Sequence, residues 1–377
     1  MEVFTGMIIP EITEETNFWM IRAKKGFFYD EFISKKFIAI GWNSLRKSQL
    51  HENMTKEHIR ALKEIIKEDY DEKRPGTALN KCINFCNEMK EKDLVMIVDK
   101  ARISFAVVGE YFEDDNPKYN SKYEKDVHEM IRNATKSNEI KYECPYIKRR
   151  HITLLKEIQE DYFSPYLYKA VAVNRHSLSN VNDYASIILN SCFESYIYKD
   201  RLVVSFRVNK RDDINAIDLA DFISSSAKLV TNEMENINDV VVKTSVHSPG
   251  DIILEIVNYV SSHKFYVMLL YIAIFGGKAG NYELNSIISC IKSLINLKYE
   301  KEKKKLELKK LKFEGDLLEQ QVIEMQLENA KKAVENTLCN TDVIVSQVAQ
   351  SANSLEIEMP DAKVIEISKY IDKYKDQ

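Results

Sequence analysis

The sequence predicts an α+β protein. A β-rich, barrel-like N-terminal module with inserted helices is followed by a mixed α/β middle region and a long C-terminal helix. Three observations predict this class: short runs of β-branched and aromatic residues before residue 160, apolar residues at helical spacing between them, and a charged amphipathic segment after residue 297. The chain has 377 residues, of which 45% are hydrophobic, so it can bury a core in two or three domains. We expect domains at residues 1–160, 161–296 and 297–377.

The first region alternates predicted strands and helices. Strands are expected over residues 18–23, 37–42, 94–99 and 103–111, which are rich in β-branched and aromatic side chains. Apolar residues recur at helical spacing over residues 55–70, with Thr55 as the N-cap. Pro75 and Gly76 should end that helix, and a second helix should cover residues 78–90.

The middle region repeats the mixed pattern. Helices are expected over residues 183–193, 216–232 and 284–297, and strands over 201–208, 239–246 and 251–257. The last two strands should be joined through His247, Ser248, Pro249 and Gly250. The apolar run Phe265–Phe275 has eleven residues, whereas a membrane-spanning helix needs roughly 20, so we expect a core element and no stable membrane association.

One long helix is predicted over residues 297–350, before a short helix over residues 362–374. Its apolar residues fall on alternating four- and three-residue steps, interrupted at Gly315. They are Leu308, Leu311, Leu318, Val322 and Met325. This imperfect heptad pattern favours packing on a partner helix, and we expect a homo-oligomer.

Charge and cysteine content limit how the protein could bind nucleic acid and in which compartment it is expected. The formal net charge is -4, so any nucleic-acid contact requires a local basic patch. Six scattered cysteines and the absence of a signal-peptide pattern in the first ten residues favour a cytoplasmic protein with reduced thiols. Cys82 and Cys86 lie one helical turn apart, but no matching pair follows at zinc spacing, so we expect buried cysteines, no metal and no cofactor.

No enzyme motif is recognisable. The sequence contains no GxGxxG, GxSxG or HExxH, and residues 275–280 lack a phosphate-binding loop. Asp251 and Glu255 are the nearest nuclease-like carboxylates, but Val257 stands where a catalytic lysine is expected. An effector nuclease with a cryptic site in residues 161–300, or a membrane-acting effector using Phe265–Phe275, stays open as an alternative.

Both tryptophans, Trp19 and Trp42, lie in the first region among basic residues. Aromatic rings stack on nucleobases while cations hold phosphates, so a nucleic-acid site is one interpretation. The other interpretation is that both tryptophans are core residues and that the charged residues around them are solvated. The basic candidates are Arg22 beside Trp19 and the cluster Lys148, Arg149 and Arg150.

Residues 17–45 (NFWMIRAKKGFFYDEFISKKFIAIGWNSL) resemble the opening of PUA-like/EVE-like modules at the front of modification-dependent restriction proteins. Residues 92–95, 107–111 and 148–151 resemble later strands of these modules, although Lys92 replaces a glycine and Leu154 replaces a frequent tryptophan. The resemblance implies a pocket for a modified or extruded base. By position it implies that Trp19, Trp42 and Asn43 line this pocket, with Arg22 near it.

Residues 246–336 resemble a second, poorly characterised bacterial family with an S-P-G turn, an apolar helix and a long charged helix. This resemblance implies an oligomerising or effector-coupling role in stress or phage-defence proteins. We therefore expect a bacterial or phage-encoded protein that binds nucleic acid or a modified nucleotide. Its expected role is that of a sensor in anti-phage defence that self-associates through its C-terminal half.

Overall fold

The protein is a mixed α+β chain made of two compact units. The computed structural model describes residues 9–51, 53–99, 101–133, 143–210, 212–230, 240–244, 250–257, 263–280, 284–312 and 317–358. The N-terminal unit spans Thr13–Cys192, and the C-terminal unit combines the chain up to Ile12 with the chain from Phe193 onward. This grouping differs from the predicted domains, because residues 161–192 belong with the first unit and the long C-terminal helices with the strands of the middle region.

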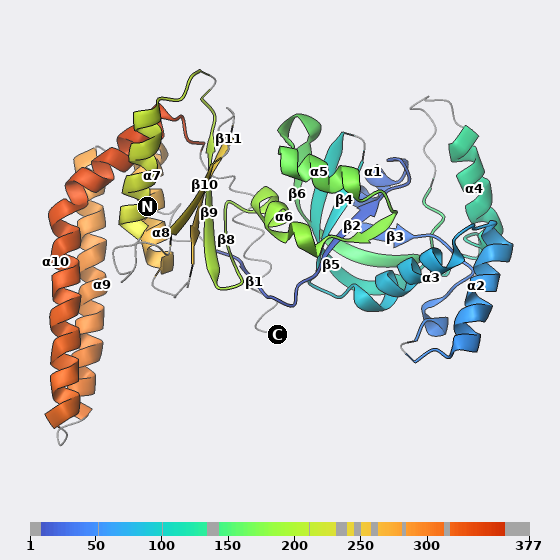
Figure 1. Ribbon diagram of the computed structural model, residues 1–377, viewed down its shortest axis with the longest axis horizontal. Coiled ribbons are helices and arrows are strands. Elements are labelled where there is room, and N and C mark those ends of the chain that lie inside the picture. The colour runs from blue at the N-terminus through green and yellow to red at the C-terminus, as the bar shows by residue number, and fades with distance from the viewer. Residues whose placement is uncertain are drawn as a thin grey trace. The chain divides into compact units, whose positions relative to one another are not determined.

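A six-stranded sheet, curled into a half-barrel, forms the frame of the N-terminal unit (Figure 1). Its strands lie in the order β3-β6-β5-β4-β2-β7. They are β2 (Phe18–Arg22), β3 (Phe37–Ile40), β4 (Leu94–Val98), β5 (Arg102–Glu113), β6 (Lys148–Gln159) and β7 (Leu178–Asn180). β2 and β4 are parallel and the other neighbours antiparallel. The residues of β4 are all buried, which explains why that strand reads as a continuous apolar run.

Within the described part of the N-terminal unit, six α-helices accompany this sheet. They are α1 (Tyr29–Lys35), α2 (Lys56–Tyr70), α3 (Pro75–Ile83), α4 (Ser121–Asn133), α5 (Pro165–Val173) and α6 (Ala185–Cys192). Short helical turns cover Lys47–Gln49, Asn84–Glu88, Glu160–Tyr162 and Asn182–Tyr184. Thr55 caps α2 as predicted, since its hydroxyl oxygen accepts the His58 N–H over 3.2 Å. Pro75 begins α3, because its fixed φ and missing N–H suit the first helical turn.

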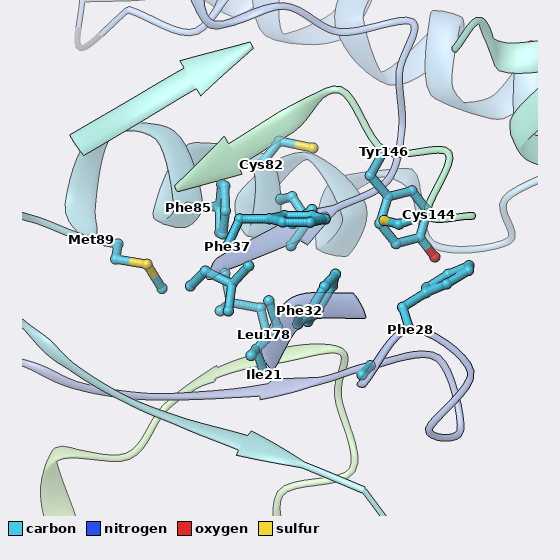
Figure 2. Packing of buried hydrophobic residues seen from close by; sticks show 14 of the residues in the cluster. Ile21, Phe28, Phe32, Phe37, Cys82, Phe85, Met89, Cys144, Tyr146 and Leu178 are labelled. Carbon is cyan, nitrogen blue, oxygen red and sulfur yellow. The ribbon is translucent and has the colours of Figure 1, made fainter. Parts of the chain in front are cut away.

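Aromatic side chains fill the space between the sheet and these helices (Figure 2). Phe28 packs edge-on against Tyr146 with ring centroids 5.3 Å apart, and Phe32 packs against Phe37 at 5.2 Å. Cys82 lies in the same core, where burial raises the pKa of its thiol to about 12. This core fixes the segments that follow β3 and precede β6, which form the candidate site.

The C-terminal unit is a five-stranded sheet with helices packed on it. Its strands lie in the order β1-β8-β9-β11-β10. They are β1 (Glu11–Ile12), β8 (Ser195–Tyr198), β9 (Arg201–Val208), β10 (Val240–Thr244) and β11 (Gly250–Ile256). The helices are α7 (Ala216–Val230), α8 (His263–Gly280), α9 (Leu284–Lys312) and α10 (Leu317–Ser354). Side chains from β9, β11 and all four helices share one apolar core.

The apolar run Phe265–Phe275 lies in α8 and contributes to this core, as predicted. Val267, Leu269 and Leu270 are fully buried there. Among the residues that the structure describes, none of the helices has the length and apolar character needed to cross a membrane.

The single helix predicted over residues 297–350 is wrong, because α9 and α10 form an antiparallel pair (Figure 1). Lys292 Nζ lies 2.7 Å from Asp342 Oδ1, and Lys310 pairs with Glu324. Eighteen residues separate the two lysines, and eighteen separate their two partners, so the helices run past each other in register. The predicted turn residues 247–249 and the predicted helix over 362–374 lie outside the described residues.

Candidate functional site

The basic cluster after residue 147 is buried and engaged by the protein itself. The Lys148 ammonium donates to the carbonyl oxygens of Trp42 at 2.7 Å and Leu45 at 2.9 Å. The Arg149 guanidinium donates to the Tyr146 carbonyl at 2.8 Å, and its NH1 lies 2.6 Å from Asp114 Oδ2.

Arg150 donates to the carbonyls of four residues on the α3–β4 and β5 segments: Phe85, Cys86, Met89 and Gly109. A buried cation needs such partners, because an unsatisfied one costs several kcal/mol. The geometry therefore does not support the phosphate role predicted for Lys148, Arg149 and Arg150. Their hydrogen bonds instead fix the loops around β3.

Trp19 and Arg22, the predicted pocket residues of β2, also have structural partners. Trp19 is buried, and its indole N–H donates to Asp93 Oδ2 over 2.8 Å. Asp93 also accepts the main-chain N–H groups of Asn17 and Lys90, so it ties the start of β2 to the turn before β4. Arg22 NH2 donates to the Val171 carbonyl over 2.6 Å. Trp19 belongs to the core against which Trp42 packs, but among the contacts of the described residues no hydrogen bond joins Trp19 or Arg22 to Trp42.

Trp42 is the exception among the predicted residues. It is the second residue after β3, is only partly buried, and has φ 61°, in the left-handed region. A bulky side chain there costs about 1–2 kcal/mol, and such outliers concentrate at functional sites. The Lys81 ammonium on α3 lies 5.6 Å from the centre of the indole ring. Trp42 thus presents an aromatic ring and a nearby cation.

The strained turn is held by Glu124 in the first turn of α4. Glu124 is 1% exposed, and its Oε1 accepts the Trp42 N–H over 2.8 Å. Its Oε2 accepts the Asn43 N–H and the Tyr70 O–H, both at 2.9 Å. Burial raises the pKa of the Glu124 carboxyl, while these donors and Lys148 oppose that shift. One buried carboxylate therefore fixes two successive main-chain N–H groups.

The side chain of Asn43 is hydrogen-bonded to neighbouring main-chain groups. Its amide donates to the carbonyls of Pro145 at 2.7 Å and Tyr119 at 3.2 Å, and its Oδ1 accepts the Ile147 N–H. Asn43 is buried and connects the Trp42 turn to the segment before β6. Of the two predicted pocket residues, Trp42 thus has a partly exposed side chain, whereas the side chain of Asn43 holds the local backbone in place.

Gly41 is the residue that permits this arrangement. A Cβ on Gly41 would lie 2.2 Å from Glu124 Oε1 and 3.1 Å from the Tyr146 ring. Real Cβ atoms do not approach other atoms so closely, so any other residue would displace the carboxylate. The Gly-Trp sequence after β3 therefore serves the Glu124 contact.

Basic groups from two elements surround Glu124. Lys24, in the turn after β2, has its pKa lowered by burial and by Arg132 and Lys25, while Glu124 opposes the shift. His128 on α4 accepts or donates a hydrogen bond with the Tyr146 hydroxyl at 2.8 Å. Burial, with Lys24 and Arg132 nearby, lowers the pKa of His128 to about 3. His128 is therefore neutral at physiological pH.

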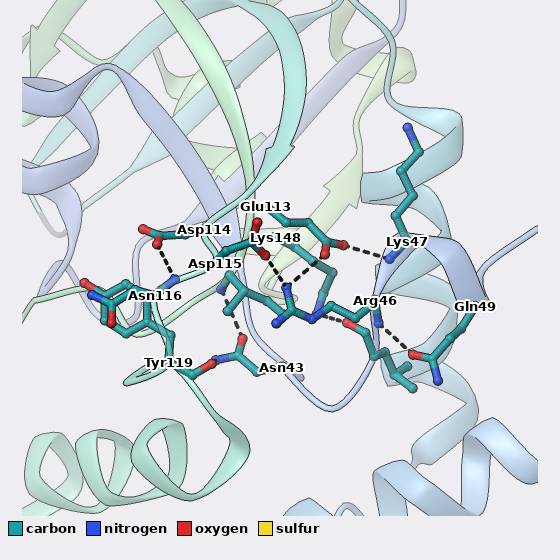
Figure 3. A network of polar contacts seen from close by, with 12 residues as sticks. Asn43, Arg46, Lys47, Gln49, Glu113, Asp114, Asp115, Asn116, Tyr119 and Lys148 are labelled. Atoms are coloured by element: carbon teal, nitrogen blue, oxygen red, sulfur yellow. Dashed lines mark hydrogen bonds and ion pairs between the residues drawn. The ribbon is translucent and has the colours of Figure 1, made fainter.

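A second polar network joins the end of β5 to the loop that contains Arg46 and Lys47 (Figure 3). Glu113 accepts from Arg46 NH1 at 3.0 Å, from the Lys47 main-chain N–H at 2.8 Å and from the Tyr111 hydroxyl at 2.8 Å. These hydrogen bonds lower the pKa of Glu113 despite its partial burial. The network anchors the loop after Trp42. It engages Arg46 and Lys47, the basic residues that follow Trp42 in the sequence.

Glu255, one of the two carboxylates considered for a nuclease, lies between two basic side chains. Both oxygens of buried Glu255 are engaged, by Lys243 at 2.5 Å and by Arg201 at 3.2 Å. Within the described residues, no group of three or more His, Cys, Asp and Glu side chains is placed to hold a metal ion.

The sequence did not reveal Glu124, Tyr70, Lys81 or His128, which complete the candidate site. Each is a single polar residue in a helix, and the helix of Glu124 was not predicted. The only available signal was Gly41 before Trp42, since a glycine at the end of a strand can mark a close approach.

The comparisons with known proteins give one family and no function. Residues 19–143 match a family described as Domain of unknown function (DUF8426), about a third of the chain. The matched segment contains Trp42, Lys81 and Glu124, and ends before Tyr146. The comparisons with curated proteins and with solved structures gave no match.

Proposed function

We propose that the N-terminal unit is a PUA-like/EVE-like binding module that holds a nucleobase, in nucleic acid or as a modified nucleotide, against the ring of Trp42. The main support is the Trp42 turn: a buried carboxylate holds a strained backbone conformation, and the side chain so placed is a half-buried indole. Strain of this kind persists only where the surroundings impose it, which favours a functional role.

The surrounding groups suit a nucleotide. Base stacking on an aromatic ring contributes about 1–3 kcal/mol per base and tolerates any base, because every base has a π face. Lys81 beside the indole, and Lys24 and Arg132 beyond Glu124, can supply the positive charge that a phosphate requires. These cations replace Lys148, Arg149 and Arg150 in the proposal.

The resemblance of residues 17–45 to PUA-like/EVE-like modules favours the same interpretation, and the curled sheet is compatible with it. The wider role follows from that resemblance. We propose a sensor of nucleic acid or a modified nucleotide in anti-phage defence. Which base or modification is bound is the question for the binding experiment.

The proposal is tested by fluorescence anisotropy with labelled single-stranded and duplex oligonucleotides, unmodified and carrying methylated or hydroxymethylated bases. Trp42→Asn is the informative variant, because asparagine tolerates φ near +60° and removes the ring without disturbing the turn. Trp42→Phe is the matched control that keeps a stacking ring. We expect binding by the wild type and Trp42→Phe, and at least a tenfold loss in Trp42→Asn. Equal affinity of all three would refute the proposed site.

A further inference from the structure

The turn after β2 carries two lysines on a strained backbone. Lys24 and Lys25 have φ 47° and 58°, in the left-handed region that residues with a side chain rarely adopt. Gly26 follows with φ 90°, and a Cβ at this position would clash with Asp99 Oδ1. Asp99 itself pairs with Arg102 over 3.3 Å. Strain of this kind persists only where the surroundings impose it, so the close packing of Gly26 on Asp99 fixes the turn that presents the lysines.

This turn lies beside α4. Phe28, at the end of the turn, packs edge-on against Tyr146 with ring centroids 5.3 Å apart (Figure 2). The Tyr146 hydroxyl lies 2.8 Å from Nε2 of His128 on α4. Arg132 follows His128 by four residues, which makes the two side chains neighbours on the helix surface. Burial and the charges of Lys24 and Arg132 lower the pKa of His128, so basic groups from both elements meet around this ring.

The cations of this cluster have no carboxylate of their own. Among the described residues, Lys24, Lys25 and Arg132 form no ion pair. Glu124 acts on Lys24 from the interior, but its two oxygens already accept two successive main-chain N–H groups. Lys24 is half-buried, and a cation withdrawn from water without a partner is costly. An anion bound at the surface of the cluster would offset that cost.

We propose that Lys24, Lys25 and Arg132, with His128 between them, bind the terminal phosphate of a phosphate monoester. Three cations gathered from two elements suit a doubly charged monoester better than a singly charged diester, because Coulomb attraction grows with the charge of the ligand. The inference rests on the proposed function and names its ligand class: a nucleotide, or a nucleic-acid end, that carries a free phosphate.

The test is isothermal titration calorimetry of the full chain with two matched probes. At pH about 7.5, methyl phosphate is a monoester with nearly two negative charges, whereas dimethyl phosphate is a diester with one. Lys24→Asn removes a cation and keeps the turn, because asparagine tolerates positive φ. Its matched control is Lys36→Asn, at an exposed lysine that also has left-handed φ, 54°. Arg132→Gln is matched by Arg60→Gln, since both arginines are exposed on helices.

We expect the wild type and both controls to bind methyl phosphate about tenfold more tightly than dimethyl phosphate. Lys24→Asn and Arg132→Gln should each lose about tenfold in affinity for methyl phosphate, as expected for one charged hydrogen bond. Because Arg132 is exposed, its variant tests the site even if Lys24→Asn perturbs the fold. Undetectable binding of methyl phosphate, equal affinity for the two probes, or equal losses in the controls would overturn the proposal.

Trp42→Asn separates this inference from the proposed function. The variant lacks the stacking ring but keeps the basic cluster, so it should bind methyl phosphate as the wild type does. Failure of the base site would appear as unchanged oligonucleotide affinity in Trp42→Asn. Failure of the phosphate site would appear as absent methyl phosphate binding in the wild type.

Discussion

The Glu124 carboxylate accepts the main-chain N–H of Trp42 over 2.8 Å and is itself 1% exposed. The contact joins the first turn of α4 to the second residue after β3, eighty-two positions earlier in the chain. It holds Trp42 at φ 61°, where a tryptophan is strained. The presentation of the indole ring therefore depends on a buried carboxylate from a different element.

Gly41→Ala should weaken ligand binding more than it weakens the fold. The new methyl group would lie 2.2 Å from Glu124 Oε1 and would push the carboxylate off the Trp42 N–H. The control is Gly76→Ala, whose Cβ would meet only the flexible end of Lys63 at 3.5 Å. Oligonucleotide anisotropy should show reduced affinity for Gly41→Ala alone. Equal affinities for both variants would separate Glu124 from binding.

Glu124→Gln should destabilise the N-terminal unit by about 1–3 kcal/mol, the cost of leaving a buried donor unsatisfied. The two N–H groups of Trp42 and Asn43 each donate to a different carboxylate oxygen, and glutamine replaces one of these oxygens by an NH2 group, which is a donor, so one N–H loses its acceptor. Both tryptophans lie in this unit, so urea unfolding followed by tryptophan fluorescence reports on it directly. Glu129→Gln, on the exposed side of the same helix, should be neutral. An unchanged free energy of unfolding in Glu124→Gln would show that the Trp42 turn does not depend on the carboxylate.

Arg150→Lys should lower stability by about 2 kcal/mol and leave the salt dependence of binding unchanged. The guanidinium donates to several carbonyls at once, which an ammonium cannot reproduce in the same geometry. Arg60→Lys, at an exposed position of α2, serves as the control in urea unfolding. A shallower salt slope in Arg150→Lys would instead restore the phosphate role that the sequence suggested.

The N-terminal unit should lose stability as the pH falls from about 6.5 toward 4, and His128 should contribute to that loss. The pKa of His128 is about 3 in the folded chain, against an ordinary value of 6.5. Between these values the unfolded chain binds the proton and the folded chain does not. The free energy of unfolding therefore falls by up to about 1.4 kcal/mol per pH unit from this group. His128→Gln should flatten the dependence, and an unchanged slope would assign the acid sensitivity to other residues.

Local patterns in the sequence were sufficient for most elements. Thr55 before an amphipathic stretch predicted α2 and its cap, and the apolar run predicted the burial of α8. The failure at the C-terminus has a clear cause. The heptad count from Leu308 to Met325 runs through the reversal between α9 and α10, because apolar spacing alone does not show where a chain turns back.

The candidate site was only partly predictable. Trp42 stood out as one of two tryptophans, but the burial of Lys148 and Arg150 depends on carbonyls from Leu45 and Phe85, far away in the sequence. A run of basic residues in a sequence resembles a surface patch even when each donor finds a main-chain acceptor. Glu124 could not be predicted, because its role arises only when α4 is placed against the end of β3.

The most direct test of the account is tryptophan fluorescence during titration with the oligonucleotide that binds best. Trp19 is buried with its indole N–H bound to Asp93, so Trp42 is the tryptophan that a stacked base can quench. The account predicts quenching in the wild type and its loss in Trp42→Phe, while anisotropy still reports binding by that variant. Binding without quenching in the wild type, or quenching that persists in Trp42→Phe, would contradict a base stacked on Trp42.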